Sequence, residues 1–230
     1  MKGKETGGGA MAASCIKILD FLQRDFLLTF KNSLLLGTAY YFLIPVIRGI
    51  SNLDEIQSAE VFGQSLALIG TIFLIPVTKK ELESGVREII YTKPWPYMKS
   101  VSLRLLCGFW LIVVMVNMFA FIMQERNCRF PFCEYVSATI LYAVFLGMLG
   151  LVFAQAGNHI AVGYLASLGY WSCCQLRILD EESIACLFPV KNGAIGAERM
   201  LIVIGADILL LVIFIFQING TGKGGVHMGD

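Results

Sequence analysis

The sequence predicts an all-α polytopic membrane protein that has an N-terminal interfacial helix, six transmembrane helices and both termini in the cytoplasm. Of its 230 residues, 57% are hydrophobic and 15% are charged, whereas a soluble domain has roughly 45–50% apolar and about 25% charged residues. The apolar residues gather in long charge-free runs, which are typical of membrane spans. With the N-terminus inside, 12 of the 18 lysines and arginines fall on the cytoplasmic side and 6 outside, as the positive-inside rule requires.

The N-terminal part of the chain predicts an interfacial elbow helix over residues 14–31. Leu22 and Phe26 lie on one face of this segment, and Asp20 and Arg24 lie on the other. A helix with one charged and one apolar face suits the membrane interface, although an amphipathic helix packed against protein has the same pattern. The polar, glycine-rich ends of the chain are predicted to be disordered. These ends are residues 1–13 and 219–230.

The spans follow from charge-free runs of about 20 residues, the length that crosses a hydrocarbon core. The run from Tyr135 to Leu176 is too long for one span and long enough for two. The polar turn Gly157–Asn158–His159 is the expected break within it. The six predicted spans, within one domain over residues 14–218, are about 33–50, 61–78, 102–123, 135–156, 160–177 and 200–218.

The segment between the second and third spans predicts a short helix with an acidic outer face. Leu82 and Val86 follow helical spacing, Glu83 and Arg87 are an i,i+4 pair, and Pro94 ends the helix. A solvated loop helix at the membrane surface would share these features. Nothing in the pattern alone distinguishes that interpretation from a docking helix.

The pattern Glu81-x-Glu83-x-Gly85-x-x-Glu88, closed by Pro94, resembles the first coupling helix of type-2 ATP-binding-cassette (ABC) permeases. The plan of the chain is similar to that family over roughly residues 14–218. The matching parts are the elbow helix (14–31), a first coupling helix (81–93), a second coupling turn (Gly157–His159) and an outer apolar segment before the last span (Ile184–Ile195).

This resemblance implies the permease subunit of an exporter in the cell membrane of a bacterium. Two permeases, identical or related, would form the pathway, and two separate ABC ATPase subunits would bind beneath them. The cargo expected is a peptide, an antibiotic or a lipid-like molecule. The residues expected to couple the permease to the ATPases are Glu81, Glu83, Ser84, Gly85, Arg87, Glu88, Pro94 and Asn158.

The chain itself is not expected to be an enzyme or to hold a cofactor. Gln217 stands where a phosphate-binding loop ending at Lys223 would need its first glycine, and Gly224 stands where it would need serine or threonine. ATP and Mg²⁺ are therefore expected in the partner ATPase. A net charge of +1, without a basic stripe, argues against nucleic acid as a partner. An intramembrane lipid-modifying enzyme and a non-catalytic immunity or partner protein remain as alternatives.

A few polar residues inside the predicted spans are candidates for a site. Asp207 either lines a substrate path or forms a structural ion pair with Arg48, because an intramembrane carboxylate normally faces the protein interior. Three amides are expected to hydrogen-bond between helices. These amides are Gln64, Asn117 and Gln155. Cys128 and Cys133 flank an outer loop, where they form either a disulfide or two free thiols, and no metal-binding motif is present.

Overall fold

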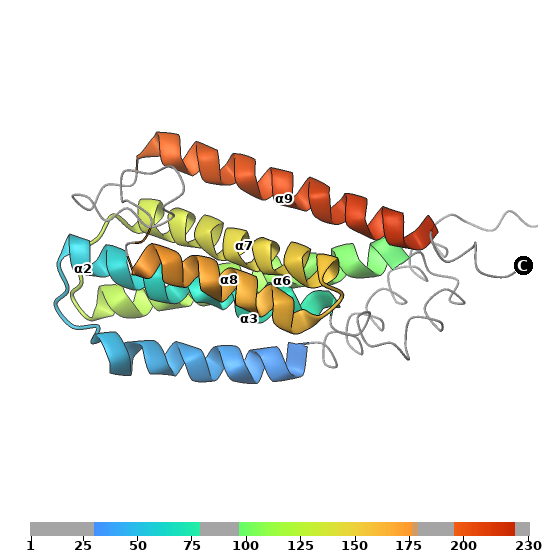
Figure 1. Ribbon diagram of the computed structural model, residues 1–230. Helices are drawn as coiled ribbons and strands as arrows, with labels where there is room; N and C mark the ends of the chain where they lie inside the picture. The colour runs from blue at the N-terminus through green and yellow to red at the C-terminus, as the bar shows by residue number, and fades with distance from the viewer. Residues whose placement is uncertain (1–29, 79–96, 177, 179–195, 224–230) are drawn as a thin grey trace, which may run out of the picture.

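The computed structural model describes residues 30–78, 97–176, 178 and 196–223, and this part of the chain is all-helical (Figure 1). The elbow helix before Phe30, the coupling helix and the Ile184–Ile195 segment lie outside the described residues. Within the described residues, five helices are long and apolar enough to cross a membrane. Those five helices are Phe30–Arg48, Glu55–Thr78, α6 (Tyr97–Glu125), α7 (Phe132–Ala156) and α9 (Ala197–Lys223).

The fifth predicted span coincides with helix α8 (Ile160–Gln175), which has only 16 residues. At 1.5 Å per residue it is about 24 Å long, shorter than a hydrocarbon core of about 30 Å. The membrane character of the chain therefore rests on five helices, and six crossings stay a prediction. The last helix is longer than expected, because α9 continues to Lys223, past the predicted end at residue 218.

The predicted break between α7 and α8 is confirmed. Helix α7 ends at Ala156, and Asn158 takes a left-handed conformation with φ of 50°. His159 then caps α8, since its Nδ1 accepts a hydrogen bond from the backbone N–H of Ala161 at 3.2 Å. This turn reverses the chain and lays α8 along α7.

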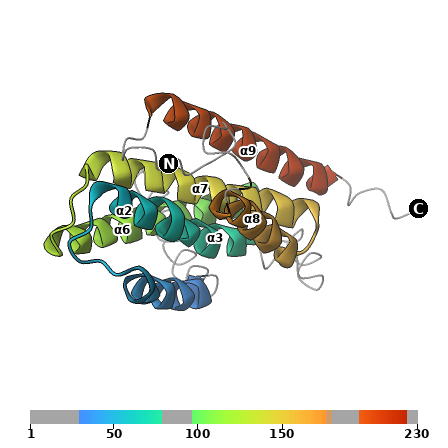
Figure 2. The same cartoon turned by 60° about the vertical axis from the view of Figure 1, so that its left-hand side comes forward.

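The second membrane helix, Glu55–Thr78, is the centre of the bundle and is irregular. It consists of α2 (Glu55–Glu60), the π-helical η1 (Val61–Ser65), the 3₁₀ turn η2 (Leu66–Leu68), α3 (Ile69–Leu74) and the 3₁₀ turn η3 (Ile75–Thr78). Of its spanning segment, 83% is buried, against 28% for the first helix and 22% for α9. The first helix and α9 lie on opposite faces of the bundle, with α3 and α7 between them (Figures 1 and 2).

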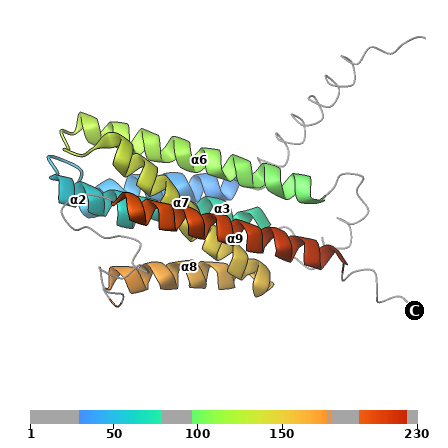
Figure 3. The same ribbon diagram turned by 90° about the horizontal axis from the view of Figure 1, so that it is seen from above.

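Glycines let the central helix approach α7 closely. A Cβ on Gly70 would overlap the carbonyl of Ala143, and a Cβ on Gly147 would lie 2.7 Å from the carbonyl oxygen of Gly70. On the other side of α7, Gly163 of α8 packs against the backbone of Gly150. Close backbone contact through small residues is a common way to associate helices in membranes. Helix α7 runs obliquely across the bundle, with α6 and α8 on opposite sides (Figure 3).

The two ends of the bundle differ. At one end, the loops 49–54 and 126–131 are joined by backbone hydrogen bonds from Asn52 N–H to Arg126 O and from Arg129 N–H to Leu53 O, both 3.1 Å. We call this the Asn52 end. The opposite end carries the α7–α8 turn, the end of the second helix and the start of α6 (Figures 1 and 3). We call it the Asn158 end.

The contact at Gly70 yields a stability prediction. The change Gly70→Ala should lower the free energy of unfolding by about 1–3 kcal/mol, because the new methyl group meets backbone that cannot move aside cheaply. The expected result is a lower melting temperature of the protein in detergent. Size-exclusion chromatography after heating measures the fraction that stays folded.

The matched control is Gly205→Ala in α9, where nothing lies within 4 Å of the added Cβ. This control should melt at the same temperature as the unchanged protein or slightly higher, because alanine favours a helix over glycine by about 1 kcal/mol. Equal melting of Gly70→Ala and the unchanged protein would contradict the close α3–α7 contact.

Candidate functional site

Two features stand out from the apolar interior of the bundle. One is a network of hydrogen bonds around the π-helical turn η1, which we call the Gln64 cluster. The other is an apolar groove beside α9 that contains a carboxylate, which we call the Asp207 groove. They differ in one respect that bears on function: the polar groups of the first are bonded to one another, and the carboxylate of the second is not.

The Gln64 cluster forms where the central helix departs from α-helical geometry. The side-chain oxygen of Gln64 accepts hydrogen bonds from Arg48 Nη2 at 2.9 Å and from Gln175 Nε2 at 2.8 Å. Arg48 Nη1 also lies 3.5 Å from a carboxylate oxygen of Glu60. Glu60 on the central helix thus balances the charge of Arg48. The side-chain oxygen of Gln64 is shared by Arg48 and by Gln175 of α8.

Two backbone carbonyls of η1 complete this cluster. Gln64 O accepts a hydrogen bond from Trp171 Nε1 at 2.7 Å, and Ser65 O accepts one from the Tyr40 hydroxyl, also at 2.7 Å. A π-helical turn often occurs at functional positions and alters the regular backbone ladder. The side chains of the first helix and α8 therefore bond to the central helix where its geometry is irregular.

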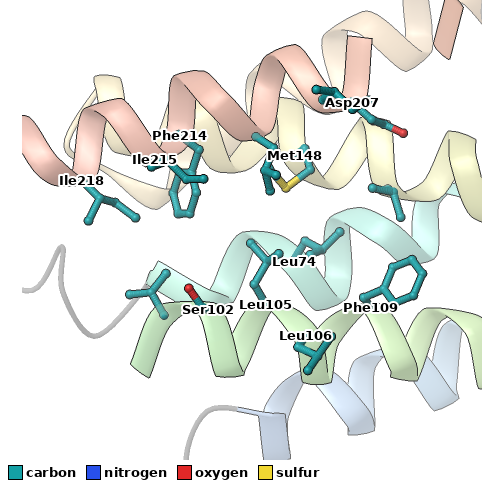
Figure 4. A pocket seen from close by; sticks show the side chains of 14 residues that line it. Leu74, Ser102, Leu105, Leu106, Phe109, Met148, Asp207, Phe214, Ile215 and Ile218 are labelled. Atoms are coloured by element: carbon teal, nitrogen blue, oxygen red, sulfur yellow. The ribbon is translucent and has the colours of Figure 1, made fainter. Parts of the chain in front are cut away.

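The Asp207 groove lies between α9 and α6, with α3 and α7 as its floor, and has a volume of about 440 Å³ (Figure 4). Its lining is apolar except for Ser102 and Asp207. Ser102 and Ile218 lie at one end of the groove, and Phe109 and Asp207 lie at the other (Figure 4). The lining residues are Leu74, Val101, Ser102, Leu105, Leu106, Phe109, Val144, Met148, Asp207, Ile208, Leu211, Phe214, Ile215 and Ile218.

Asp207 is ten residues into α9, about 15 Å along the helix. Both carboxylate oxygens are buried, and neither has a hydrogen-bond partner within the described structure. Buried polar groups are nearly always hydrogen-bonded, so an exception needs an explanation. Ionisable groups inside a membrane segment are costly and normally serve a function. We therefore regard Asp207 as the strongest candidate for a binding residue in this part of the chain.

The predicted Arg48–Asp207 ion pair is wrong. Arg48 bonds to Glu60 and Gln64, and Asp207 has no hydrogen-bond partner among the residues described. The two residues belong to the first helix and α9, which lie on opposite faces of the bundle (Figure 1). The other alternative, that Asp207 lines a substrate path, stays a prediction; Asp207 does line the groove.

Of the two alternatives left open for Cys128 and Cys133, the structure has the two free thiols. Cys128 is buried, and its sulfur lies 3.8 Å from Ile50 O, within the contact between the two loops of the Asn52 end. Cys133 is exposed at the start of α7. The inward position of one thiol and the outward position of the other keep the pair apart.

Most of the predicted coupling residues cannot be placed. Among them, Asn158 lies in the α7–α8 turn. The residues outside the described structure are Glu81, Glu83, Ser84, Gly85, Arg87, Glu88 and Pro94. In the described parts of the chain, no three His, Cys, Asp or Glu side chains gather closely enough to hold a metal ion.

The three amides expected to bond between helices have different outcomes. Gln64 does so, whereas Asn117 donates to Val113 O one turn earlier in its own helix at 2.8 Å. The side-chain oxygen of Gln155 has no hydrogen-bond partner within the described residues. Sequence reasoning missed Trp171 and Gln175, although both lie one turn apart on α8 and could have been read as a polar face.

Comparison of the chain with protein-family models, with curated proteins and with solved structures found no match. Function is therefore inferred from the arrangement of the helices, the Asp207 groove and the residues of the chain itself.

The Gln64 cluster makes a prediction about coupled side chains. The change Gln64→Leu should lower the free energy of unfolding by about 1–3 kcal/mol, because the Arg48 and Gln175 donors lose a partly buried acceptor. The change Gln175→Leu should also destabilise the protein. The double variant should lose less than the sum of the two single losses, because both changes remove the same bond.

Melting temperatures of the four proteins in one detergent measure this coupling. Gln124→Leu at the exposed end of α6 is the control and should change the melting temperature little. Strictly additive losses would show that Gln64 and Gln175 do not share a hydrogen bond.

Proposed function

We propose that this chain is the membrane permease subunit of an ATP-driven exporter of the ABC type. In this proposal it works as a dimer, with a second copy or a related permease, on two separate ATPase subunits. The observation that carries the proposal is an agreement between topology and sequence. The end of the second helix and the start of α6, which flank the acidic segment, lie at the Asn158 end together with the α7–α8 turn (Figure 1).

A permease needs its contacts with the motor protein on one side of the membrane. The acidic segment and the α7–α8 turn are the two sites that the family resemblance assigns to ATPase binding. The helices that flank the acidic segment have their ends at the Asn158 end, where the α7–α8 turn also lies. The carboxylates of Glu81, Glu83 and Glu88 would supply charge complementary to a basic groove on the ATPase. Gly85 would permit close approach of the two backbones.

The exposed helices support a role within a larger assembly. The spanning segments of the first helix, α6 and α9 are at most 28% buried, and their outward faces are apolar. Lipid covers such faces in a membrane, and a second permease can replace lipid on one of them. We assign the substrate path to the side of the bundle that carries the Asp207 groove.

The chemistry of export would be divided between the subunits. The ATPases would bind ATP and Mg²⁺ and hydrolyse the nucleotide, and the permease would change conformation without catalysing a reaction. The location that fits is the cell membrane of a bacterium, in which the chain crosses several times. The cargo classes that fit are peptides, antibiotics and lipid-like molecules, since the groove is almost entirely apolar.

Reversing the charge of the acidic segment tests ATPase binding. The triple change Glu81→Lys, Glu83→Lys and Glu88→Lys should abolish co-purification of the permease with its ATPase, because like charges repel at the proposed interface. Co-purification from cells that express the neighbouring genes, with ATP hydrolysis of the complex as a second readout, measures the effect.

The control reverses three charges away from this interface. The changed residues are all at the Asn52 end and are Glu55, Glu125 and Glu134. With lysine at these three positions, the permease should still co-purify with its ATPase. If the Glu81, Glu83 and Glu88 variant still bound the ATPase and still transported cargo, the acidic segment would not be the site that binds the ATPase.

Thiol labelling tests the orientation. In a background with the other cysteines replaced, a single cysteine at position 84 should react with a membrane-impermeant maleimide only after the cells are permeabilised. The native Cys133, exposed at the Asn52 end, should react in intact cells, because the positive-inside rule puts that end outside. Labelling of position 84 in intact cells would exclude an ATPase from that segment.

A further inference from the structure

We propose that the Asp207 groove binds a lipophilic cation, a molecule with a hydrophobic body and one positively charged group. For the proposed exporter, such a cation would be the class of substrate that is transported. Only this identification of the ligand as cargo rests on the proposed function. Binding itself requires nothing but the groove.

The groove has room for a sizeable apolar body. From Asp207 to Ile218 the groove follows eleven residues of α9, about 16 Å at the helical rise, and its volume is about 440 Å³. Aliphatic and aromatic side chains from four helices line it, with Ser102 as the one polar side chain at the far end. Pockets for small molecules are typically apolar with a few well-placed polar groups that set orientation.

The charge selects among apolar ligands. None of the lining side chains is Lys, Arg or His, and the two buried oxygens of Asp207 have no hydrogen-bond partner in the described structure. A neutral ligand without a hydrogen-bond donor would leave this carboxyl unpaired, and the carboxylate would repel an anion. A cation would pair with it in a medium of low dielectric constant, where opposite charges attract most strongly.

Arg199, on the same helix as Asp207, does not line the groove, and two cations on other helices are engaged elsewhere. Arg48 bonds to Glu60 and Gln64. Arg104, on the α6 turn next to Ser102, donates to Val77 O at 3.4 Å and does not line the groove. The described residues that line the groove therefore supply no positive group to this carboxylate, and in the proposal the ligand supplies it.

A pair of probes with the same shape and opposite charge tests the proposal. Tetraphenylphosphonium is the cation and tetraphenylborate is the matched anion. Binding of each probe is measured by equilibrium dialysis to the purified chain in phosphatidylcholine nanodiscs, with the signal of empty nanodiscs subtracted. We expect saturable binding of the cation to the unchanged protein.

The isosteric change Asp207→Asn should weaken binding of the cation at least about tenfold, as loss of one partner of a buried charge pair does. It should leave binding of the anion unchanged or improve it. The control is Glu198→Gln, the same chemical change at the exposed start of the same helix, which should bind both probes like the unchanged protein.

A second variant separates the groove from the charge. Leu211 lines the groove and is 38% exposed, so Leu211→Trp should fill the space without disturbing the core and should weaken binding of the cation. Equal cation affinity in the unchanged and Asp207→Asn proteins would overturn the proposal, as would binding no greater than that of empty nanodiscs, which would mean that lipid tails fill the groove.

The ATPase is absent from this assay, so its outcome is independent of the proposed coupling. Failure of the permease to associate with an ATPase would remove the proposed function and leave cation binding intact. Loss of cation binding would remove the substrate class and leave ATPase association intact.

Discussion

Every polar backbone group inside a membrane needs a hydrogen-bond partner within the protein, and this requirement shapes the centre of the bundle. The second helix passes through π-helical and 3₁₀ turns in the middle of its course. Its neighbours bond to it there, Trp171 from α8 and Tyr40 from the first helix. This single buried and irregular helix thereby fixes the positions of the helices on both sides of it.

The glycine contacts and the groove are two consequences of the same packing. Gly70 and Gly147 bring α3 against α7 so closely that these two helices form a nearly solid centre. Helix α9 packs chiefly on α7 and hardly touches α6, so the space between α6 and α9 is left unfilled. The apolar groove is therefore a product of helix placement, and Asp207 is the one charged residue that lines it.

Long charge-free runs were enough to locate the membrane helices, because the cost of a charge in hydrocarbon is large. They were not enough to set the ends. The second helix begins at Glu55, six residues before the predicted start, because the charge-free run excluded Glu60, whose carboxylate pairs with Arg48. The same pairing made the predicted Arg48–Asp207 bridge wrong: similar depth in the membrane says nothing about which face a residue occupies. The π-helical turn had no signal in the sequence, since backbone irregularity of this kind is imposed by packing.

The contrast between Arg48 and Asp207 separates a structural charge from one available to a ligand. Both lie in helices that the sequence identifies as membrane spans, and desolvation penalises both in the same way. Arg48 meets a carboxylate and an amide, so the cost is offset within the fold and the group holds helices together. The carboxylate of Asp207 has no such hydrogen-bond partner in the described structure, yet its helix places it in a groove of ligand size. An unbalanced charge is retained in a folded chain at a cost to stability, and a ligand of opposite charge is what would offset that cost.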